Sequence, residues 1–192
     1  KLNIYKNPKN LGYGGNQKKG YNYAIKKGYD IVVMLHGDVQ YAPEKIPQLI
    51  KPIERGEADV VFGSRILGTP LRQGMPLWKY IGNRVLTTIE NMFLPINLSE
   101  FHTGFRAFRC DALKDIPYTR CSNDYDFDTE VVLQLVLKNK RFKEIPIPTH
   151  YGPESHQITF LLSVEYGLRI MRSLIQYKLH TLGFKKIRKF DF

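Results

Sequence analysis

The chain has 192 residues, enough for a single domain with one hydrophobic core, and 43% of them are hydrophobic, which argues against a disordered protein. Its formal net charge of +11 predicts an anionic partner such as a nucleic acid, a phosphorylated ligand or an acidic membrane surface. Two cysteines without metal-ligand spacing favour a reducing compartment. No apolar run approaches the roughly 18–20 residues of a membrane-spanning helix, and there is no signal peptide. Because the sequence opens on Lys1 in mid-pattern, we expect a fragment of a longer chain.

The N-terminal part predicts a short strand at residues 2–5, a glycine-rich turn at residues 7–16 and a helix at residues 17–27 that Gly28 closes. A glycine-rich turn that opens a helix can hold a phosphate on its backbone N–H groups. The glycines of this turn lack the spacing of the dinucleotide-binding fold, so an ordinary turn is the favoured interpretation.

The most informative stretch is the apolar run at residues 31–35, which is rich in β-branched residues and typical of a strand buried on both faces. It stops at a polar cluster that contains His36, Asp38 and Gln40. In open α/β sheets, ligands bind at the carboxyl ends of the strands. Asp38 would hold a divalent metal ion there, assisted by His36 or Gln40. A polar turn that only ends the strand is the alternative, and this stretch alone leaves both open.

Helices then alternate with strands, which favours an α/β sheet. A helix at residues 43–54, shortened or kinked by its prolines, precedes a second buried strand at residues 58–65 and a mobile loop at residues 67–76. Residues 77–93 predict a helix that serves a core, a membrane or a dimer. Its apolar stripe consists of Tyr80, Ile81, Val85, Ile89, Met92 and Phe93.

Residues 99–109 pack polar and aromatic side chains around Gly104 and predict a strand flanked by a turn. Residues 123–137 predict a helix that opens with four carboxylates. The helix macrodipole explains two or three of these charges and leaves open that one carboxylate points into a site. Residues 143–148 have the pattern of an edge strand, because their prolines bar a central position.

The C-terminal part predicts a helix at residues 160–182 with basic residues among and after its apolar ones. Its apolar positions are Leu161, Val164, Leu168, Met171, Ile175 and Leu179. A basic amphipathic helix of this kind lies in a membrane interface. The alternative is a helix that packs on its own domain and has a solvated basic end. Both interpretations stay open.

Six of these stretches, in their order and spacing, resemble family 2 glycosyltransferases of the GT-A fold, and among them the polyprenyl-phosphate and dolichyl-phosphate sugar transferases. The stretches are residues 10–16, 36–41, 62–65, 74–80, 99–108 and 125–130. The resemblance implies a Rossmann-like α/β domain in residues 1–158, with a mostly parallel sheet flanked by helices, and a basic amphipathic helix and tail in residues 159–192. The opening strands of the family, which hold the nucleotide base, have no counterpart. We therefore expect an N-terminally incomplete fold that binds nucleotide-sugar poorly by itself.

The resemblance also implies a reaction, the transfer of a sugar from a nucleotide-sugar to a lipid-phosphate, hydroxyl or glycan acceptor. The expected location is peripheral, at the cytoplasmic, inner face of a membrane. A metal ion, Mg²⁺ or Mn²⁺, would be bound by His36, Asp38 and Gln40, with His36 replacing the first carboxylate of the family's Asp-x-Asp motif. Asp126 or Asp128 matches the region that supplies a general base, although an anionic lipid phosphate needs no strong base. The resemblance assigns phosphate or substrate binding to Arg65, His102, Thr103, Arg106, Arg84 and Ser155.

Two other classes of function compete with this interpretation. A non-catalytic module of the same fold would use its basic surface to bind a membrane or a protein partner. A nucleic-acid-binding module is disfavoured, because the basic residues are scattered apart from the C-terminal cluster and no recognised motif is present. We therefore expect no nucleic-acid partner and an anionic membrane surface as a partner, and the two long helices would also serve a homodimer.

Overall fold

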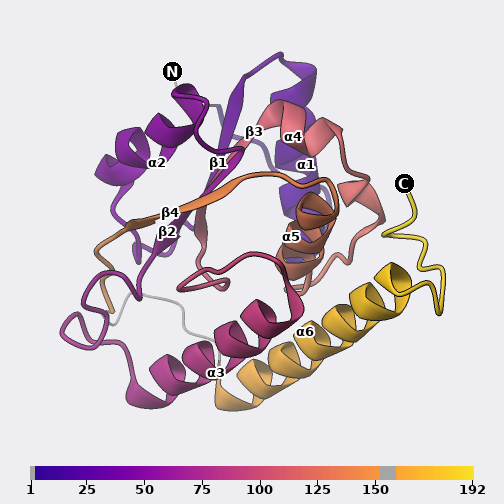
Figure 1. The fold of residues 1–192 in the computed structure, drawn as a ribbon. Helices are drawn as coiled ribbons and strands as arrows, with labels where there is room; N and C mark the ends of the chain where they lie inside the picture. The colour runs from indigo at the N-terminus through magenta and orange to yellow at the C-terminus, as the bar shows by residue number, and fades with distance from the viewer. Residues whose placement is uncertain (1–2, 152–158) are drawn as a thin grey trace.

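The computed structural model describes residues 3–151 and 159–192 (Figure 1). Its strands are β1 (Ile31–Leu35), β2 (Val60–Ser64), β3 (Phe105–Arg109) and β4 (Phe142–Pro146). Its α-helices are α1 (Tyr13–Lys26), α2 (Ile46–Glu54), α3 (Leu77–Phe93), α4 (Cys110–Lys114), α5 (Phe127–Leu137) and α6 (Phe160–Thr181), and two short 3₁₀ turns are η1 (Pro43–Lys45) and η2 (Tyr118–Arg120).

The four strands form one mixed sheet in the order β1-β3-β2-β4. β3 runs antiparallel to both of its neighbours, whereas β4 is parallel to β2. The expected α/β sheet is therefore present, but it is mixed rather than mostly parallel in its pairing. The reason is that β3 follows a turn at residues 99–104, which returns the chain in the opposite direction between β1 and β2.

This topology brings three chain segments to one edge of the sheet. Leu35 at the end of β1 pairs with Phe105 at the start of β3, and Phe62 near the end of β2 pairs with Arg106. The residues that follow β1 and β2 therefore lie beside the turn that precedes β3. The candidate residues at positions 36–40, 65 and 99–104 are collected here by the fold.

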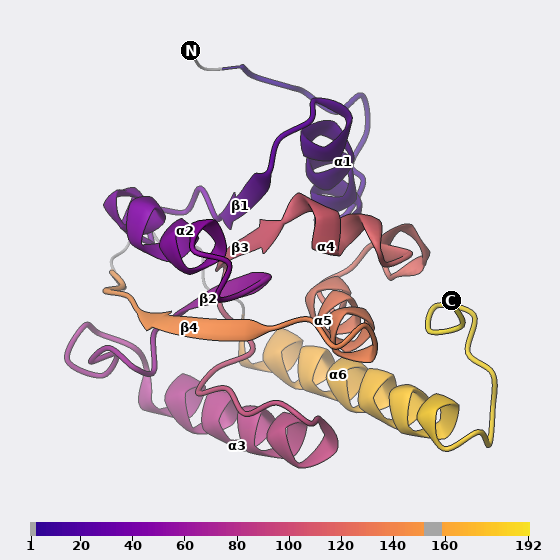
Figure 2. The same ribbon diagram turned by 45° about the horizontal axis from the view of Figure 1, so that its top comes forward.

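Helices cover both faces of the sheet, as the ribbons show (Figures 1 and 2). On one face, α2 packs Leu49 and Ile53 against Val61, Phe105 and Ala107. On the other face, the larger core joins side chains of α4, α5 and α6 to the alternate strand residues. Its strand members include Val60, Phe62 and Phe108. Burial on both faces is what the continuous apolar runs predicted.

The N-terminal prediction is partly wrong in its boundaries. The described residues of the expected strand at 2–5 form no ladder, and Tyr5 instead packs its ring on Tyr23 of α1. Helix α1 begins at Tyr13, inside the predicted turn, because Gly12 has φ 75° and Gly14 packs closely against Phe127. The left-handed closing residue Gly28 (φ 74°) and the edge position of β4 are as expected.

The two long helices pack some apolar side chains on the core, among them Leu86 and Ile89 of α3 and Leu174 of α6, but leave many others at the surface. The buried residues of α3 are polar, namely Asn83, Thr87 and Glu90. Its exposed residues include Leu77, Trp78, Ile81, Val85 and Met92. Helix α6 lies beside α3 along one side of the molecule (Figures 1 and 2). Its exposed residues include Leu161, Leu162, Val164, Leu168 and Ile175. Among the described residues, no helix is both long and apolar enough to cross a bilayer.

The close packing of Gly14 makes a stability test possible. A Cβ at Gly14 would lie 2.5 Å from Cβ of Phe127 and 2.6 Å from the carbonyl oxygen of Ser122, so we expect Gly14→Ala to destabilise the fold by about 1–3 kcal/mol. The matched control is Gly20→Ala in the same helix, where nothing lies within 4 Å of the added Cβ. That change should stabilise by roughly 0.5–1 kcal/mol. Urea unfolding of both variants measures the difference, and equal stabilities would contradict it.

Candidate active site

A buried chain of polar contacts connects the end of β1 to α5. Nε2 of His36 lies 2.9 Å from the Tyr13 hydroxyl, which donates to Oδ2 of Asp128 at 2.7 Å. Asp128 also accepts from Gln17 at 3.0 Å and pairs with Arg106 at 3.3 Å. The ring of His36 covers Gly104, where a Cβ would lie only 2.4 Å from Nδ1. Glycine at 104 is therefore required for this contact.

In this row of polar contacts, burial favours the neutral forms of Tyr13 and His36. Burial raises the pKa of Tyr13 well above its usual value, and the Asp128 carboxylate adds to the rise. Burial also lowers the pKa of His36, so the neutral imidazole is favoured. Tyr13 is thus a stable hydrogen-bond donor to Asp128. Because Asp128 is shared by three donors, it holds the chain in place rather than facing an acceptor.

The second candidate base, Asp126, lies elsewhere. It is the residue before α5, and its Oδ1 atom is 3.8 Å from the guanidinium of Arg169 on α6. Arg169 also pairs with Asp124 at 2.8 Å. The two carboxylates predicted from the sequence therefore have different surroundings. Asp128 belongs to the row of polar contacts that includes Tyr13 and His36, whereas Asp126 faces α6.

Arg65 follows β2 and is almost completely buried against Glu100. Nε of Arg65 donates to Glu100 at 2.7 Å, and the Arg65 backbone N–H donates to the same carboxylate at 2.8 Å. The Asn83 amide of α3 also donates to Glu100, at 2.7 Å. Nη1 of Arg65 makes a longer contact with the Tyr151 hydroxyl at 3.3 Å. Nη1 is thus the part of this guanidinium with the weakest internal partner.

Lys79, in the first turn of α3, is a further candidate residue that the sequence pattern did not indicate. Its ammonium lies 5.4 Å from the centre of the Tyr151 ring. Burial lowers its pKa to about 8, and the charge of Arg65 lowers it further, while Asp38 and Glu100 oppose the shift. A half-buried lysine beside an arginine is a place where an anion would relieve repulsion between two cations. The signal available was a basic residue in a stretch already noted for its resemblance, residues 74–80.

The remaining residues expected to bind substrate are engaged within the protein. Nε2 of His102 lies 2.9 Å from the carboxylate of Glu90 on α3. Arg106 is fully buried and donates to the carbonyl oxygens of Thr103 and Phe101. Thr103 itself is buried and accepts from the backbone N–H of Phe105. Arg106 and Thr103 therefore support the turn before β3, whereas the buried ring nitrogens of His102 have no hydrogen-bond partner among the described residues.

Two further expected residues have different outcomes. Arg84 is exposed on α3 and donates to the carbonyl oxygen of Ser99 at 3.2 Å. Ser155 lies outside the described residues.

The three expected metal ligands differ in whether their donor atoms are available. Nε2 of His36 faces Tyr13, so the structure does not offer this ring as a ligand. Asp38 is partly exposed, and one of its oxygens accepts from the Gln40 backbone. The Gln40 amide is buried, and its nitrogen has no partner among the described residues. A half-turn of that amide presents an oxygen instead, so Asp38 and Gln40 fit a hard cation. The described residues hold no cluster of three or more His, Cys, Asp or Glu side chains placed for a metal.

Backbone strain marks the same loop. Val39, between Asp38 and Gln40, has φ 59°, a left-handed conformation that is unusual for a β-branched residue. Contacts on either side hold it, because Asp38 accepts from the Gln40 N–H and the Gln40 carbonyl accepts from His150. Strained backbone of this kind is concentrated at functional sites, which supports the loop at residues 38–40 as part of the candidate site.

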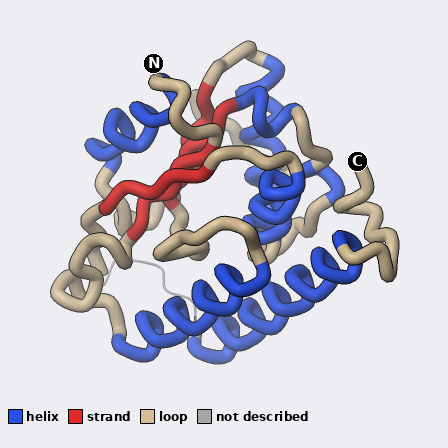
Figure 3. The backbone as a smooth tube through the Cα atoms, in the orientation of Figure 1, coloured by secondary structure: helices blue, strands red, loops and turns tan. Residues whose placement is uncertain are grey.

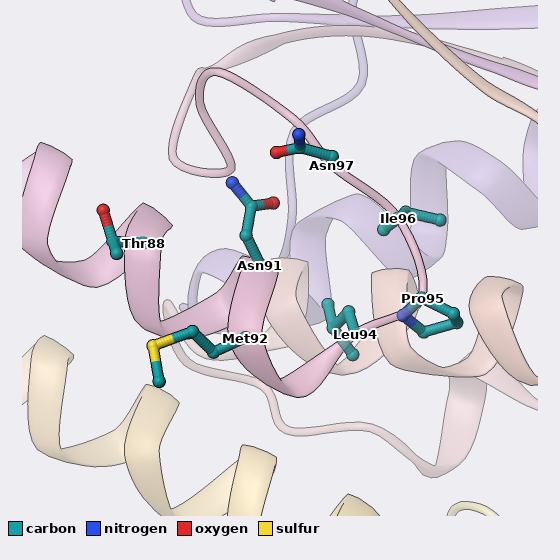
Figure 4. Close-up of a pocket in the computed structure, with 7 residues that line it drawn as sticks. All are labelled: Thr88, Asn91, Met92, Leu94, Pro95, Ile96 and Asn97. Carbon is teal, nitrogen blue, oxygen red and sulfur yellow. The ribbon is translucent and has the colours of Figure 1, made fainter.

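Two cavities border these elements. One of about 620 Å³ opens beside Tyr13. Its lining residues are Asn7, Lys9, Asn10, Leu11, Gly12, Tyr13, Asn16, Asp124 and Tyr125. Another, of about 500 Å³, lies at the other end of α3 from Lys79, where Met92 points toward a neighbouring helix (Figure 4). There the Asn91 amide is bonded to the Leu98 backbone, which leaves this hollow without a free polar group from that residue.

A family model of glycosyl transferase family 2 matches residues 1–117. The UDP-N-acetylglucosamine–dolichyl-phosphate N-acetylglucosaminyltransferase of Methanococcus voltae is 31% identical over 180 residues, which cover 93% of this chain and 70% of that protein. The chain belongs to glycosyl transferase family 2. This membership confirms the resemblance that the six stretches indicated.

Two other relatives of the family share less of their length with this chain. The low-salt glycan biosynthesis hexosyltransferase Agl6 of Haloferax volcanii is 33% identical over 69% of the chain, and the chain covers 33% of its length. The undecaprenyl-phosphate mannosyltransferase of Micrococcus luteus is 28% identical over 71% of the chain, and the chain covers 56% of its length. The chain thus spans between a third and about two thirds of the relatives it matches.

Solved structures of similar fold confirm the GT-A-like architecture of this family 2 domain. Glucosyl-3-phosphoglycerate synthase from Mycobacterium tuberculosis, in complex with phosphoglyceric acid, superimposes with a TM-score of 0.65 at 14% identity. The match covers 89% of this chain and 56% of that one. The same enzyme in complex with Mg²⁺ and uridine diphosphate gives a TM-score of 0.63. Figure 3 shows the shared plan in this chain, a short sheet enclosed by helices.

The buried ion pair gives a second test of stability. Glu100→Ala leaves the Arg65 charge buried without its carboxylate, so we expect a loss of about 3–5 kcal/mol in the free energy of unfolding. The control is Glu57→Ala, whose salt bridge to Lys143 lies at the surface, where solvent screening leaves it with little effect on stability. Denaturant unfolding compares the two variants. Similar small losses in both would show that Arg65 does not depend on Glu100.

Proposed function

We propose that this chain forms part of an enzyme that transfers a sugar from a nucleotide-sugar to the phosphate of a membrane lipid. The observation that carries the proposal is the position of Lys79. Its ammonium lies over the ring of Tyr151, whose hydroxyl accepts from Nη1 of the buried Arg65. Lys79 lies at the end of a helix whose exposed residues include Leu77, Trp78 and Ile81. A lipid phosphate has the complementary form, an anionic head on an apolar chain. The names of relatives that act on dolichyl and undecaprenyl phosphates support the same acceptor.

The chemistry requires little of the protein beyond placement and charge. An oxygen of the acceptor phosphate attacks the anomeric carbon of the sugar, and the bond to the donor diphosphate breaks, so the nucleoside diphosphate leaves with the electron pair. Lys79 and Nη1 of Arg65 would hold the acceptor phosphate and screen its charge. No general base is needed for an ionised phosphate. Asp128, which is bound to Arg106 and Tyr13, is therefore not required as a base in this reaction.

The donor would lie in the cavity beside Tyr13, whose hydroxyl contacts His36 at the start of the loop that carries Asp38. Asp38 and Gln40 would hold Mg²⁺ or Mn²⁺, which when bound neutralises charge on the leaving diphosphate. A non-catalytic module remains the alternative, but the relatives are named as transferases and do not favour it. Metal-dependent transfer to a polyprenyl phosphate, abolished by Asp38→Asn in a folded protein, is the direct test.

We also place the domain at the inner face of an anionic membrane. The exposed apolar residues of α3 and α6 lie on neighbouring helices, and basic residues accompany them. These include Arg84, Arg172, Lys185, Lys186 and Arg188. Each basic residue near an anionic leaflet contributes on the order of 1 kcal/mol. Charge complementarity thus favours a bilayer over a second copy of this chain, which carries the same positive charge.

The pKa of Lys79 predicts an alkaline limit of activity. Below about pH 8 the ammonium is charged and binds phosphate, and as the pH rises through that value the charge is lost. We expect kcat/KM, which reports the free enzyme, to fall above pH 8. In Lys79→Arg the guanidinium stays charged, so the fall should move beyond the accessible range. Lys79→Met should be impaired at every pH. An unchanged profile in Lys79→Arg would exclude Lys79 as the titrating group.

The single tryptophan of the chain, Trp78, reports membrane docking directly. We expect its fluorescence to shift to the blue on addition of phosphatidylglycerol vesicles but not of neutral ones. Burial of one isoleucine side chain contributes about 1.5–3 kcal/mol, so Ile81→Asp should weaken vesicle affinity at least about tenfold.

The control is Ile4→Asp, because Ile4 is also exposed but lies in the N-terminal segment, away from α3 and α6 (Figure 1). Equal weakening in both variants would contradict the assigned face. If the chain instead self-associates without vesicles, and Ile81→Asp disrupts that association, the face is a homodimer interface.

A further inference from the structure

Tyr151 follows a short backbone segment that contacts two loops of the candidate site. The backbone N–H of Thr149 donates to the side-chain oxygen of Gln73 at 2.8 Å, and the Thr149 hydroxyl donates to the same oxygen at 3.0 Å. The backbone N–H of His150 donates to the carbonyl oxygen of Gln40 at 2.9 Å. These bonds fix the backbone that leads into Tyr151, so the fold determines where its side chain lies.

The Tyr151 side chain contacts both of the cations proposed to hold the acceptor phosphate. Its hydroxyl accepts from Nη1 of Arg65 at 3.3 Å. The centre of its ring lies 5.4 Å from the ammonium of Lys79, and the face of an aromatic ring attracts a cation at this distance. One aromatic side chain therefore connects two basic residues that follow different elements, β2 and the start of α3.

The hydroxyl of Tyr151 still has a proton to donate. A phenol can both accept and donate a hydrogen bond, and the contact with Arg65 uses only its ability to accept. Among the residues that the structure describes, none accepts the proton of this hydroxyl. Burial raises the pKa of Tyr151 to about 12, so the proton is retained at neutral pH. Lys79, Nη1 of Arg65 and the Tyr151 hydroxyl thus form a group of three hydrogen-bond donors.

We propose that the Tyr151 hydroxyl donates a hydrogen bond to the acceptor phosphate and thereby makes the site selective for a phosphate monoester over a phosphate diester. The inference rests on the acceptor proposed above and deepens it. A monoester has three terminal oxygens, one for each of the three donors. In a diester, one of these oxygens carries a second ester bond and accepts poorly.

The selectivity has a consequence for turnover. A site built to bond to a polar group loses affinity for an analogue that lacks this group, because one of its donors is left without a partner. The product of the proposed transfer is a phosphate diester, since the sugar is attached to an oxygen of the acceptor phosphate. The hydroxyl that helps to bind the acceptor would therefore favour release of the product.

Calorimetric titration of the full chain with farnesyl monophosphate and with its methyl diester measures this selectivity. We expect the wild type to bind the monoester at least about tenfold more tightly, the smallest factor ordinarily contributed by a hydrogen bond to a charged group. Tyr151→Phe keeps the ring beside Lys79 and removes the hydroxyl. It should bind the monoester about tenfold more weakly and the diester as the wild type does, so the ratio of the two dissociation constants should fall about tenfold.

Two further variants separate this role from a structural one. Tyr118→Phe also removes a hydroxyl that is hydrogen-bonded within the protein, but to Asn22 of α1, and it should leave the ratio unchanged. Lys79→Met removes a cation and should weaken the binding of both ligands. In active enzyme, Tyr151→Phe should raise KM for the acceptor and leave KM for the nucleotide-sugar unchanged.

Each outcome decides the question. A wild type without selectivity, a selectivity that persists in Tyr151→Phe, or one that falls equally in Tyr118→Phe overturns the inference. Equal weakening of both ligands by Tyr151→Phe also overturns it, because the residue would then act only by holding Lys79. Absence of phosphate binding by the wild type overturns both this inference and the proposed acceptor. Selectivity that depends on Tyr151, without any sugar transfer, would refute the proposed reaction alone.

Discussion

The buried ion pair between Arg65 and Glu100 is the interaction on which the site depends. It joins the end of β2 to the turn before β3, and Asn83 extends it to α3. Glu144 of β4 supports the same turn by accepting from the backbone N–H groups of Ser99 and Glu100. Desolvating two charges is costly, and the geometry offsets the cost only because the other polar atoms around them are bonded. The pair thereby fixes the end of β2 against the turn before β3 and against α3.

A second buried arginine, Arg106 of β3, also holds separate segments together. Arg106 fixes the carbonyl oxygens before β3 and also pairs with Asp128 of α5. Consecutive residues alternate across a strand, and here that alternation places Arg106 and Phe62 in the same layer, with the guanidinium 4.8 Å from the ring. The charge of Arg106 is thus enclosed by aromatic and backbone groups. This arrangement explains why a residue expected to bind substrate supports the site from below.

The sequence predicted the elements well because their signals are local. Apolar runs of β-branched residues, helical periodicity, and glycine or proline at boundaries each reflect the conformation of a few residues. The position of β3 between β1 and β2 was not available in this way, since the direction of a strand is set by pairing with distant partners. The same limit applies to the site. Asp38 and Arg65 follow strands and could be put forward as candidates, whereas Lys79 stands out only when the ring of Tyr151 is seen beneath its ammonium.

The helix α3 shows most clearly what periodicity leaves undecided. A stripe of apolar residues at helical spacing shows that the two faces of a helix differ in polarity. It does not show which face packs on the domain. In α3 the inward side carries polar residues, since Asn83 donates to Glu100 and Glu90 lies 2.9 Å from His102. Leu86, Ile89 and Phe93 pack on the core beside them. Polar groups can be buried when they are paired. Other apolar residues of the helix, among them Trp78, Ile81 and Val85, are left at the surface. Which residues of the helix meet the domain is therefore decided by the partners that Asn83 and Leu86 find there, and periodicity alone does not contain this information.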